Sequence, residues 1–168
     1  HEQIEISDPQ SVATALSAAQ PDVVINTAAY NLVDQAEDEP QRAFAVNAEG
    51  PRNLARWCRS RDAFLVHVST DYVFGGDAAR RVPYRETDPP SPLGQYGHSK
   101  LAGEAALAEE CPQSLIVRTC GLYGRSATRA KGNFVATILR LARERNEIRV
   151  VHDQVFTPSY TADVDAGI

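Results

Sequence analysis

The sequence lacks methionine and has no hydrophobic run near the length of a membrane-spanning helix. Such a helix needs about 20 consecutive apolar residues, so we expect no membrane insertion. The amino end has no secretory signal pattern, which favours a cytoplasmic location. From the absence of methionine and the start on His1, we expect these 168 residues to be part of a longer protein.

Cysteine and positive charge are also scarce. The three cysteines, Cys58, Cys111 and Cys120, form neither a CxxC pair nor zinc-ligand spacing, so we expect reduced thiols and no metal site. Seventeen lysines and arginines stand against 22 acidic residues, which gives a net charge of −5. An acidic protein of this kind is not expected to bind nucleic acid or an anionic membrane surface.

What the sequence does contain is an alternation of short apolar runs with helical patterns. The apolar runs, which are strand candidates, cover residues 23–25, 63–68, 114–117 and 148–151. Helical spacing covers residues 9–19, 40–59, 95–110 and 134–145. Continuous apolar runs are typical of parallel strands buried on both faces, and their alternation with helices predicts an α/β fold. We therefore expect residues 1–168 to belong to one domain with a doubly wound parallel sheet of Rossmann type.

Tyr96 and Lys100 lie four residues apart in a predicted helix, so they share one face of it. A cation near a phenol favours the phenolate and lowers the tyrosine pKa from its usual value of about 10. Such a pair can serve as a general acid and base. The same spacing is common on solvated helix faces, where it has no catalytic role.

Small polar residues follow two of the predicted strands. Ser69 and Thr70 come at the carboxyl end of a strand, where parallel sheets bind ligands and where a hydroxyl can hydrogen-bond a carbonyl oxygen. Their alternative role is to satisfy backbone groups in a turn. Asn26 to Tyr30 follow the first strand, and the small residues among them would let a flat cofactor approach the backbone. Tight packing between strand and helix explains the small residues equally well.

Together and in this order, the motifs resemble the extended short-chain dehydrogenase/reductase family, and within it the reductases of nucleotide 4-keto sugars. The resemblance runs over nearly the whole chain. It is carried by residues 26–30, 33–40, 46–47, 68–74, 86–88, 91–93, 96–104, 118–124, 133–135 and 153–154, with Pro158.

The resemblance implies a role for each matching residue. Tyr96 would protonate the C4 oxygen of the sugar as hydride arrives from NADPH or NADH, and Lys100 would lower the tyrosine pKa and hold the nicotinamide ribose. Thr70 would hydrogen-bond the reacting oxygen, with Asp71 as a substrate contact. The implied activity is reduction of the 4-keto group of a nucleotide sugar in dTDP-rhamnose biosynthesis. The positions implied to line the cofactor, besides Tyr96 and Lys100, are Ala28, Ala29 and Asn31.

Two other functions share these motifs. A nucleotide-sugar epimerase uses the same tyrosine and lysine, and a non-catalytic regulatory subunit, such as that of methionine adenosyltransferase, looks similar. A dehydratase is disfavoured because Tyr72, not a second carboxylate, follows Asp71. The glycine-rich turn that would bind the pyrophosphate is absent from these 168 residues. The choice between NAD and NADP therefore stays open, as does the formation of a homodimer.

Two positions raise separate questions. Pro51 has no N–H, so the carbonyl of Asn47, four residues earlier, loses its helical partner. That carbonyl would either hold a water of a proton relay or point to solvent at a proline kink. Gly121 stands where many such reductases carry a tryptophan that packs on the sugar. Either another aromatic fills the gap or the pocket accepts a wider range of sugars, and we expect the second.

Overall fold

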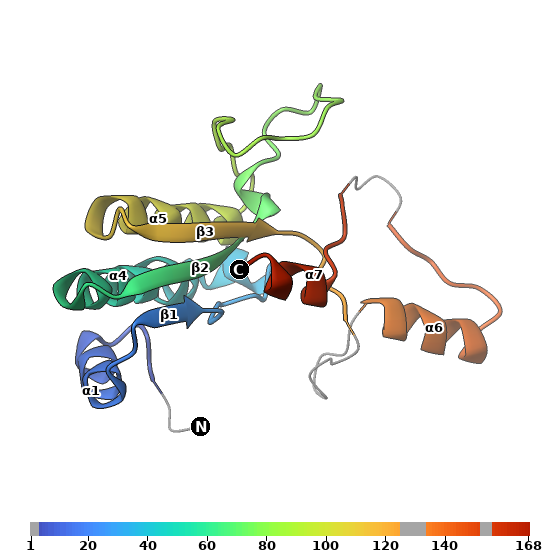
Figure 1. Cartoon of the computed structure of the whole chain (residues 1–168). Coiled ribbons are helices and arrows are strands. Elements are labelled where there is room, and N and C mark those ends of the chain that lie inside the picture. Colours follow the sequence, from blue (N-terminus) through green and yellow to red (C-terminus); the bar gives the residue numbers. More distant parts are fainter. Residues whose placement is uncertain (1–3, 125–133, 152–155) are drawn as a thin grey trace. The chain divides into compact units, whose positions relative to one another are not determined.

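The structure is a computed structural model that describes residues 4–124, 134–151 and 156–168. Contacts divide the chain into two compact units, His1–Arg118 and Thr119–Ile168. Figure 1 gives the order of the elements along the chain.

A three-stranded sheet organises the first unit (Figure 1). Its strands are β1 (Val23–Asn26), β2 (Phe64–Thr70) and β3 (Ser114–Thr119), in the order β1-β2-β3. β1 and β2 pair in parallel, with Asn26 opposite His67. Three of the four predicted strands therefore form, and the α/β class is confirmed.

The prediction of a fourth strand is wrong. Residues 148–151 belong to the second unit and have no strand conformation there. Val150 and Val151 are 56% and 69% exposed. A short apolar run does not specify a strand, because a strand also needs a partner and a surface that buries its side chains.

Helices of the first unit flank the sheet. The first begins at Asp8, whose carboxylate accepts the Gln10 N–H at 2.9 Å and so satisfies one free donor of the first turn. The helical elements of this unit are α1 (Pro9–Ala19), α2 (Gln35–Asp38), α3 (Pro40–Phe44), the π-helical turn η1 (Ala45–Glu49), α4 (Gly50–Arg61), the 3-10 turn η2 (Asp71–Val73) and α5 (Gln95–Glu110).

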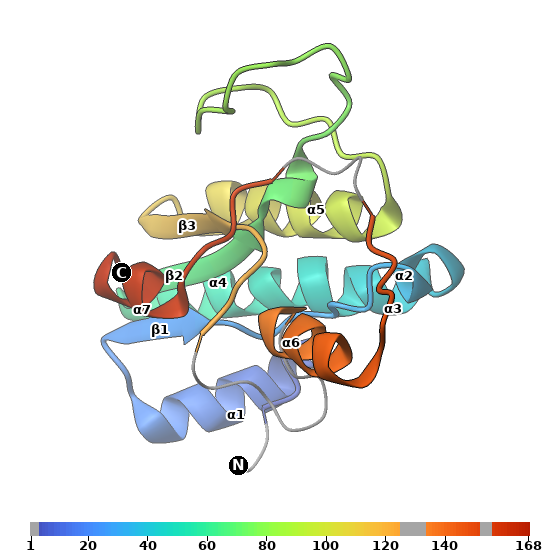
Figure 2. The same ribbon diagram turned by 90° about the vertical axis from the view of Figure 1, so that its right-hand side faces the viewer.

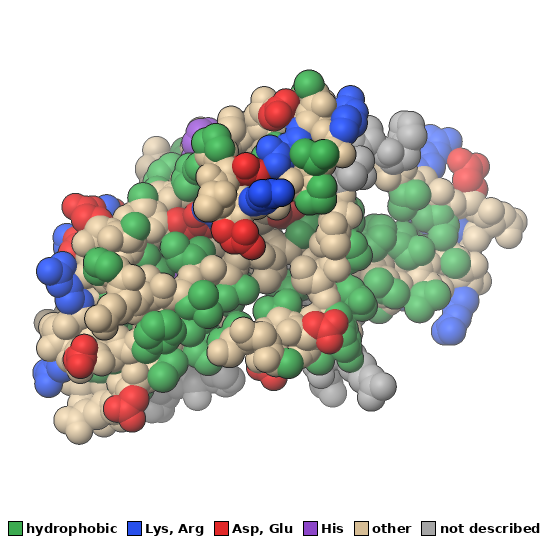
Figure 3. Space-filling view, turned by 45° about the horizontal axis from the view of Figure 1, so that its top comes forward, with side chains coloured by type: hydrophobic (Ala, Val, Ile, Leu, Met, Phe, Trp, Pro, Cys, Tyr) green, Lys and Arg blue, Asp and Glu red, His purple; other side chains and the backbone are tan. Residues whose placement is uncertain are grey.

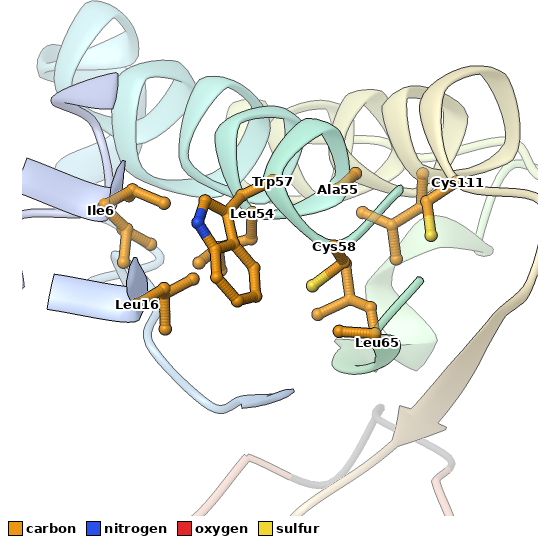
Figure 4. Packing of buried hydrophobic residues seen from close by; sticks show 11 residues of the cluster. Ile6, Leu16, Leu54, Ala55, Trp57, Cys58, Leu65 and Cys111 are labelled. Carbon is orange, nitrogen blue, oxygen red and sulfur yellow. The ribbon is translucent and has the colours of Figure 1, made fainter. Parts of the chain in front are cut away.

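The main core lies between these helices and one face of the sheet (Figure 4). Trp57 and Leu54 of α4 lie close to Leu16 of α1, and Leu65 of β2 is fully buried in the same cluster. Side chains alternate between the two faces of a strand. The other face of the sheet therefore carries large exposed apolar side chains, namely Val23, Ile25, Phe64 and Leu115. Apolar side chains also cover much of the surface seen in Figure 3.

The long helix predicted over residues 40–59 forms with a change of register in its middle. α3 passes into η1, where the Gly50 N–H donates to the Ala45 carbonyl five residues earlier, and α4 follows. The π-helical turn lies directly before Pro51, whose missing N–H would interrupt a regular α-helix at this point.

The irregular segment after η2 protrudes from the first unit (Figure 2, green). Its base is ordered by stacking: the rings of Phe74 and Tyr84 lie 4.2 Å apart and nearly parallel. The guanidinium of Arg80 lies 4.0 Å from the Tyr84 ring, and that of Arg118 lies 5.0 Å from the Phe74 ring. Each ring of the stack therefore also makes a cation–π contact with an arginine.

The second unit contains α6 (Phe134–Glu144) and α7 (Thr161–Ala166). Tyr123 and Tyr160 form a parallel bridge, with ring centroids 5.4 Å apart. Across the described ranges of both units, no helix is long and apolar enough to cross a membrane.

Candidate active site

Thr70 and Tyr96 meet where β2 ends and α5 begins. Their side chains share a hydrogen bond. Thr70 Oγ1 also accepts the Tyr72 N–H at 3.2 Å and donates to Asp71 Oδ1 at 3.4 Å. The hydroxyl therefore both supports the turn and faces the phenol, so the two roles predicted for it coexist. Three of the predicted site residues, Thr70, Asp71 and Tyr96, are brought together.

A glycine allows α5 to approach the end of β2 this closely. A Cβ added at Gly97 would overlap the Tyr72 carbonyl oxygen, which is backbone and cannot rotate away. The ring of Tyr72 meets that of Tyr96 edge-on, with centroids 5.6 Å apart. Gly97 thus sets the position of the catalytic candidate Tyr96.

The phenol of Tyr96 is favoured in its protonated form. Burial raises its pKa above the usual value, the hydrogen bond with Thr70 opposes this rise, and Tyr72 and Asp71 add to it. The expected lowering of the pKa by Lys100 is not seen in this structure, because the lysine is directed to other partners. A protonated phenol suits a proton donor at neutral pH.

Lys100 lies one turn further along α5 and is 1% exposed. Its Nζ donates to the Val68 carbonyl at 2.8 Å and lies 3.4 Å from His67 Nε2. Burial lowers the pKa of Lys100 to about 8, with Glu104 acting in the opposite direction. Burial also lowers the pKa of His67 to about 3, and Lys100 adds to that shift. The imidazole is therefore neutral beside the amine.

Asn47 connects the segment after β1 with α5. Its Oδ1 accepts the Tyr30 N–H at 2.8 Å, and its Nδ2 donates to the Tyr30 carbonyl and to Ser99 Oγ, both at 3.0 Å. Asn47 is fully buried. This burial excludes the alternative in which a proline kink directs its carbonyl to solvent. Its carbonyl oxygen faces Gly103, where a Cβ would overlap it. A water on that carbonyl stays a prediction.

Sequence reasoning missed a buried ion pair behind the site. Glu104, 4% exposed, accepts from Arg118 Nη2 at 2.6 Å and from Ser69 Oγ at 2.6 Å. It also missed His67 as a partner of Lys100. The sequence feature that could have revealed both contacts is the placement of polar residues inside apolar strand and helix patterns, since buried polar groups need partners.

The residues predicted to line a cofactor follow β1. Ala28 and Asn31 are exposed and Ala29 is half-buried. The Ala28 N–H donates to Asn26 Oδ1 at 3.1 Å, and Asn26 Nδ2 lies 3.0 Å from His67 Nδ1. This segment is therefore joined to Lys100 through Asn26 and His67, although no spacing in the sequence links them.

The family described as "RmlD substrate binding domain" matches residues 1–168. The chain belongs to this family.

Curated relatives of this RmlD-family chain include two mycobacterial proteins. The dTDP-4-dehydrorhamnose reductase of Mycolicibacterium smegmatis is 49% identical over 163 residues, which are 96% of this chain and 48% of the relative. The protein of the same name from Mycobacterium tuberculosis H37Rv is 44% identical over 176 residues, covering 99% of this chain and 56% of the relative. The chain thus spans about half the length of the curated relatives it matches.

Solved structures agree with the family assignment. The dTDP-4-dehydrorhamnose reductase of Bacillus anthracis, in complex with NADP, is 42% identical with a TM-score of 0.90, covering 98% of this chain and 56% of that chain. The UDP-glucose 4-epimerase of Thermotoga maritima, 23% identical with a TM-score of 0.83 over 98% of this chain and 55% of that chain, shares the fold. The Rossmann-type class predicted from the sequence is confirmed.

Gly121 of this RmlD-family chain is not beside an empty gap. A Cβ at position 121 would lie 2.8 Å from Phe156 Cε2, in the same unit. An aromatic ring therefore takes the space, which was the alternative we did not favour, and the expectation of a wider sugar range loses its structural basis. Other parts of the family pattern, Asn133 and residues 153–154, lie outside the described residues.

We expect Gly121→Trp to destabilise the protein without improving catalysis. Gly121 has φ +46°, a conformation that side chains other than glycine rarely adopt, and its Cβ would press on Phe156. The measurements are the thermal midpoint and kcat/KM for a panel of nucleotide 4-keto sugars in the complete protein. A stable variant with a higher kcat/KM for the rhamnose precursor would contradict this reading.

Proposed function

We propose that the protein containing this chain is an oxidoreductase that reduces the 4-keto group of dTDP-4-dehydrorhamnose with NADPH or NADH. The observation that carries the proposal is the geometry at the carboxyl end of β2, where the Tyr96 phenol is hydrogen-bonded to Thr70. The names of the relatives, at 44–49% identity, support the substrate. The bound NADP of the Bacillus anthracis relative supports the cofactor.

The residues of the site have complementary roles in this proposal. Tyr96 gives its proton to the C4 oxygen of the sugar, since burial keeps the phenol protonated. Thr70 hydrogen-bonds the same oxygen and stabilises the negative charge that develops on it. Asp71, next to Thr70, contacts the sugar. The bound nicotinamide supplies the hydride.

The residues present fit one part of such a cofactor. Lys100 Nζ keeps a hydrogen for a ribose hydroxyl after bonding Val68, and Tyr96 lies one turn before it on α5. Ala28, Ala29 and Asn31 follow β1, where two small side chains leave room for a flat ring. These residues would hold the nicotinamide ribose. A glycine-rich pyrophosphate turn is not among the 168 residues.

We further propose that residues 1–168 are a portion of one NAD(P)-binding domain and enter the substrate region near Ile168. The uncovered apolar side chains of the sheet, such as Ile25 and Phe64, support a longer domain, since exposed surfaces of this kind usually contact another element. The nucleotide-sugar partner, a cytoplasmic location and the formation of a homodimer are parts of the same proposal.

The test is product analysis with the complete protein, dTDP-4-dehydrorhamnose and NADPH. We expect dTDP-rhamnose with one NADPH oxidised per product. Conversion of a nucleotide sugar without net oxidation of NADPH would indicate an epimerase instead. Binding without turnover would indicate a regulatory subunit.

We expect the 168-residue chain by itself to bind NADPH more weakly than the micromolar range. Backbone N–H groups at a helix amino end provide most of a pyrophosphate site, and the turn that carries them is not in this sequence. Isothermal titration of the chain, with the complete protein as the control, measures the difference. A micromolar dissociation constant for the chain alone would mean that residues 1–168 hold the pyrophosphate too.

A further inference from the structure

We propose that Asn26 and His67 are a positioning pair for Lys100: Asn26 fixes the tautomer of the imidazole, whose Nε2–H then donates to Lys100 Nζ and favours the neutral amine. The consequence for catalysis rests on the proposed function. The chain of hydrogen bonds from Ala28 to Lys100 is independent of that function, because each of its steps follows from the contacts of the described residues.

The first step fixes the amide of Asn26. The Ala28 N–H donates to Asn26 Oδ1 at 3.1 Å, and a backbone N–H can only be a donor. Turning the amide over would place its NH₂ group against that N–H. The Oδ1 atom therefore stays toward Ala28, and Nδ2 stays toward His67.

The second step fixes the tautomer of His67. Asn26 Nδ2 is a donor and lies 3.0 Å from His67 Nδ1, so Nδ1 must accept and carries no proton. A neutral imidazole has one N–H, which then lies on Nε2. The imidazolium would place a second N–H against the amide, and the pKa of His67, lowered to about 3, agrees with its absence.

The third step concerns Lys100. Its Nζ is 3.4 Å from the protonated Nε2 and 2.8 Å from the Val68 carbonyl. An ammonium has only donors, so it would face the Nε2–H donor to donor. A neutral amine has a lone pair for that N–H and two hydrogens. One hydrogen bonds Val68, and the other remains for a hydroxyl of the cofactor.

Charges around Lys100 do not reverse this preference. Glu104, one turn further on α5, favours the ammonium but is itself paired with Arg118 of β3 and with Ser69. Tyr96 is protonated, and Asn26 and Asn47 are neutral. Most other charged groups on elements packed against α5 have partners elsewhere: Glu37 with the Gln95 N–H, Arg42 with Glu39, Arg52 with Glu49 and Glu110, Arg56 with Glu110, Arg59 with the Glu110 carbonyl, and Asp71 with Thr70. Asp38 of α2 and Arg61 of α4 are exposed to solvent.

The pair gives Lys100 a function that a fixed cation cannot have. Burial lowers the pKa of Lys100 to about 8, and the Nε2–H of His67 acts in the same direction, so the amine can gain and lose a proton close to physiological pH. A group that titrates near the working pH is suited to move protons during turnover. The cofactor-lining segment, through Ala28 and Asn26, thereby influences the protonation of Lys100.

The direct test is nitrogen-15 NMR of the complete protein. His67 should show a protonated Nε2 and an unprotonated Nδ1 at neutral pH, with His67→Phe identifying its signals. The pKa of Lys100, followed by NMR with isotope-labelled lysine and assigned with Lys100→Met, should be about 8 or lower. A proton on His67 Nδ1 in the unmodified protein would overturn the proposal.

Two variants test the direction of the coupling. In Asn26→Asp the carboxylate can accept both the Ala28 N–H and an Nδ1–H, so the tautomer should switch and the pKa of Lys100 should rise by at least about one unit. In His67→Phe the amine loses a donor, so its pKa should also rise. If His67 instead accepted from an ammonium, that substitution would lower the pKa, and a fall would contradict the proposal.

Two controls separate the tautomer from added charge: His67→Phe removes the imidazole without adding charge, and Gln113→Glu adds the charge at an exposed position. Gln113→Glu is isosteric and should change neither the tautomer nor the pKa of Lys100. In turnover assays, the lysine limb of the pH profile should move to higher pH in Asn26→Asp and stay in place in Gln113→Glu. The NMR measurements need no turnover. A protein without reductase activity would therefore contradict the proposed function only. The NMR measurements would still decide whether Asn26 and His67 form the positioning pair.

Discussion

Tyr96→Phe in the complete protein should lower kcat at least about 100-fold, the usual scale for loss of a general acid. The substitution removes only the phenolic oxygen, and with it the hydrogen bond to Thr70. The edge-on contact with the Tyr72 ring, at 5.6 Å between centroids, is preserved by phenylalanine. We therefore expect a folded protein with normal stability that has lost its proton donor.

The measurement is kcat with NADPH and dTDP-4-dehydrorhamnose, together with the thermal midpoint of unfolding. Tyr84→Phe is a matched control, because it makes the same chemical change in a ring that stacks on Phe74 in the protruding segment. The control should keep its activity. Near-normal kcat in Tyr96→Phe would assign the proton to another donor, with Thr70 or a bound water as the next candidates.

Gly103→Ala should lower the free energy of unfolding by about 1–3 kcal/mol, the usual cost of overpacking a buried position. The added Cβ would overlap the Asn47 carbonyl oxygen, so either α5 or η1 has to move. Asn47 bonds both Tyr30 and Ser99 from η1. Any shift therefore displaces the cofactor-lining segment relative to Tyr96, and we expect kcat to fall as well.

Urea denaturation and steady-state kinetics measure the two effects. Gly50→Ala is the control, since its Cβ would meet only side-chain atoms of Ile6, which can adjust. Gly50→Ala should retain its activity and lose less stability. Equal losses of stability in both variants, with kcat unchanged in Gly103→Ala, would show that the contact of α5 with η1 does not position the site.

Local sequence determined the main elements and the candidate residues. The apolar runs at 63–68 and 114–117 lie between helical patterns that need a sheet to cover, and both runs form strands. The spacing of Tyr96 and Lys100 places them one turn apart on any helix, whatever the fold. Thr70, at the end of β2, follows from the rule that ligands bind at the carboxyl ends of parallel strands.

Tertiary structure decided what these residues contact. Residues 148–151 have an apolar run like the other strands, but no pairing partner holds them in a sheet within the described part of the second unit. Phe156, 35 residues after Gly121, takes the space that a tryptophan at that position would need. Neither outcome follows from local pattern, because each depends on a segment distant in the sequence.

The environment of Lys100 shows the same division. The sequence places the lysine next to a tyrosine and predicts a cation that lowers the pKa of that tyrosine. Burial of the phenol raises that pKa instead, and Lys100 lies beside His67, which pairs with Asn26, 41 residues away in the sequence. Hydrogen-bond donors and acceptors are matched across strands and helices only after the chain has folded. The sequence could therefore name Lys100, while the fold alone determines its protonation.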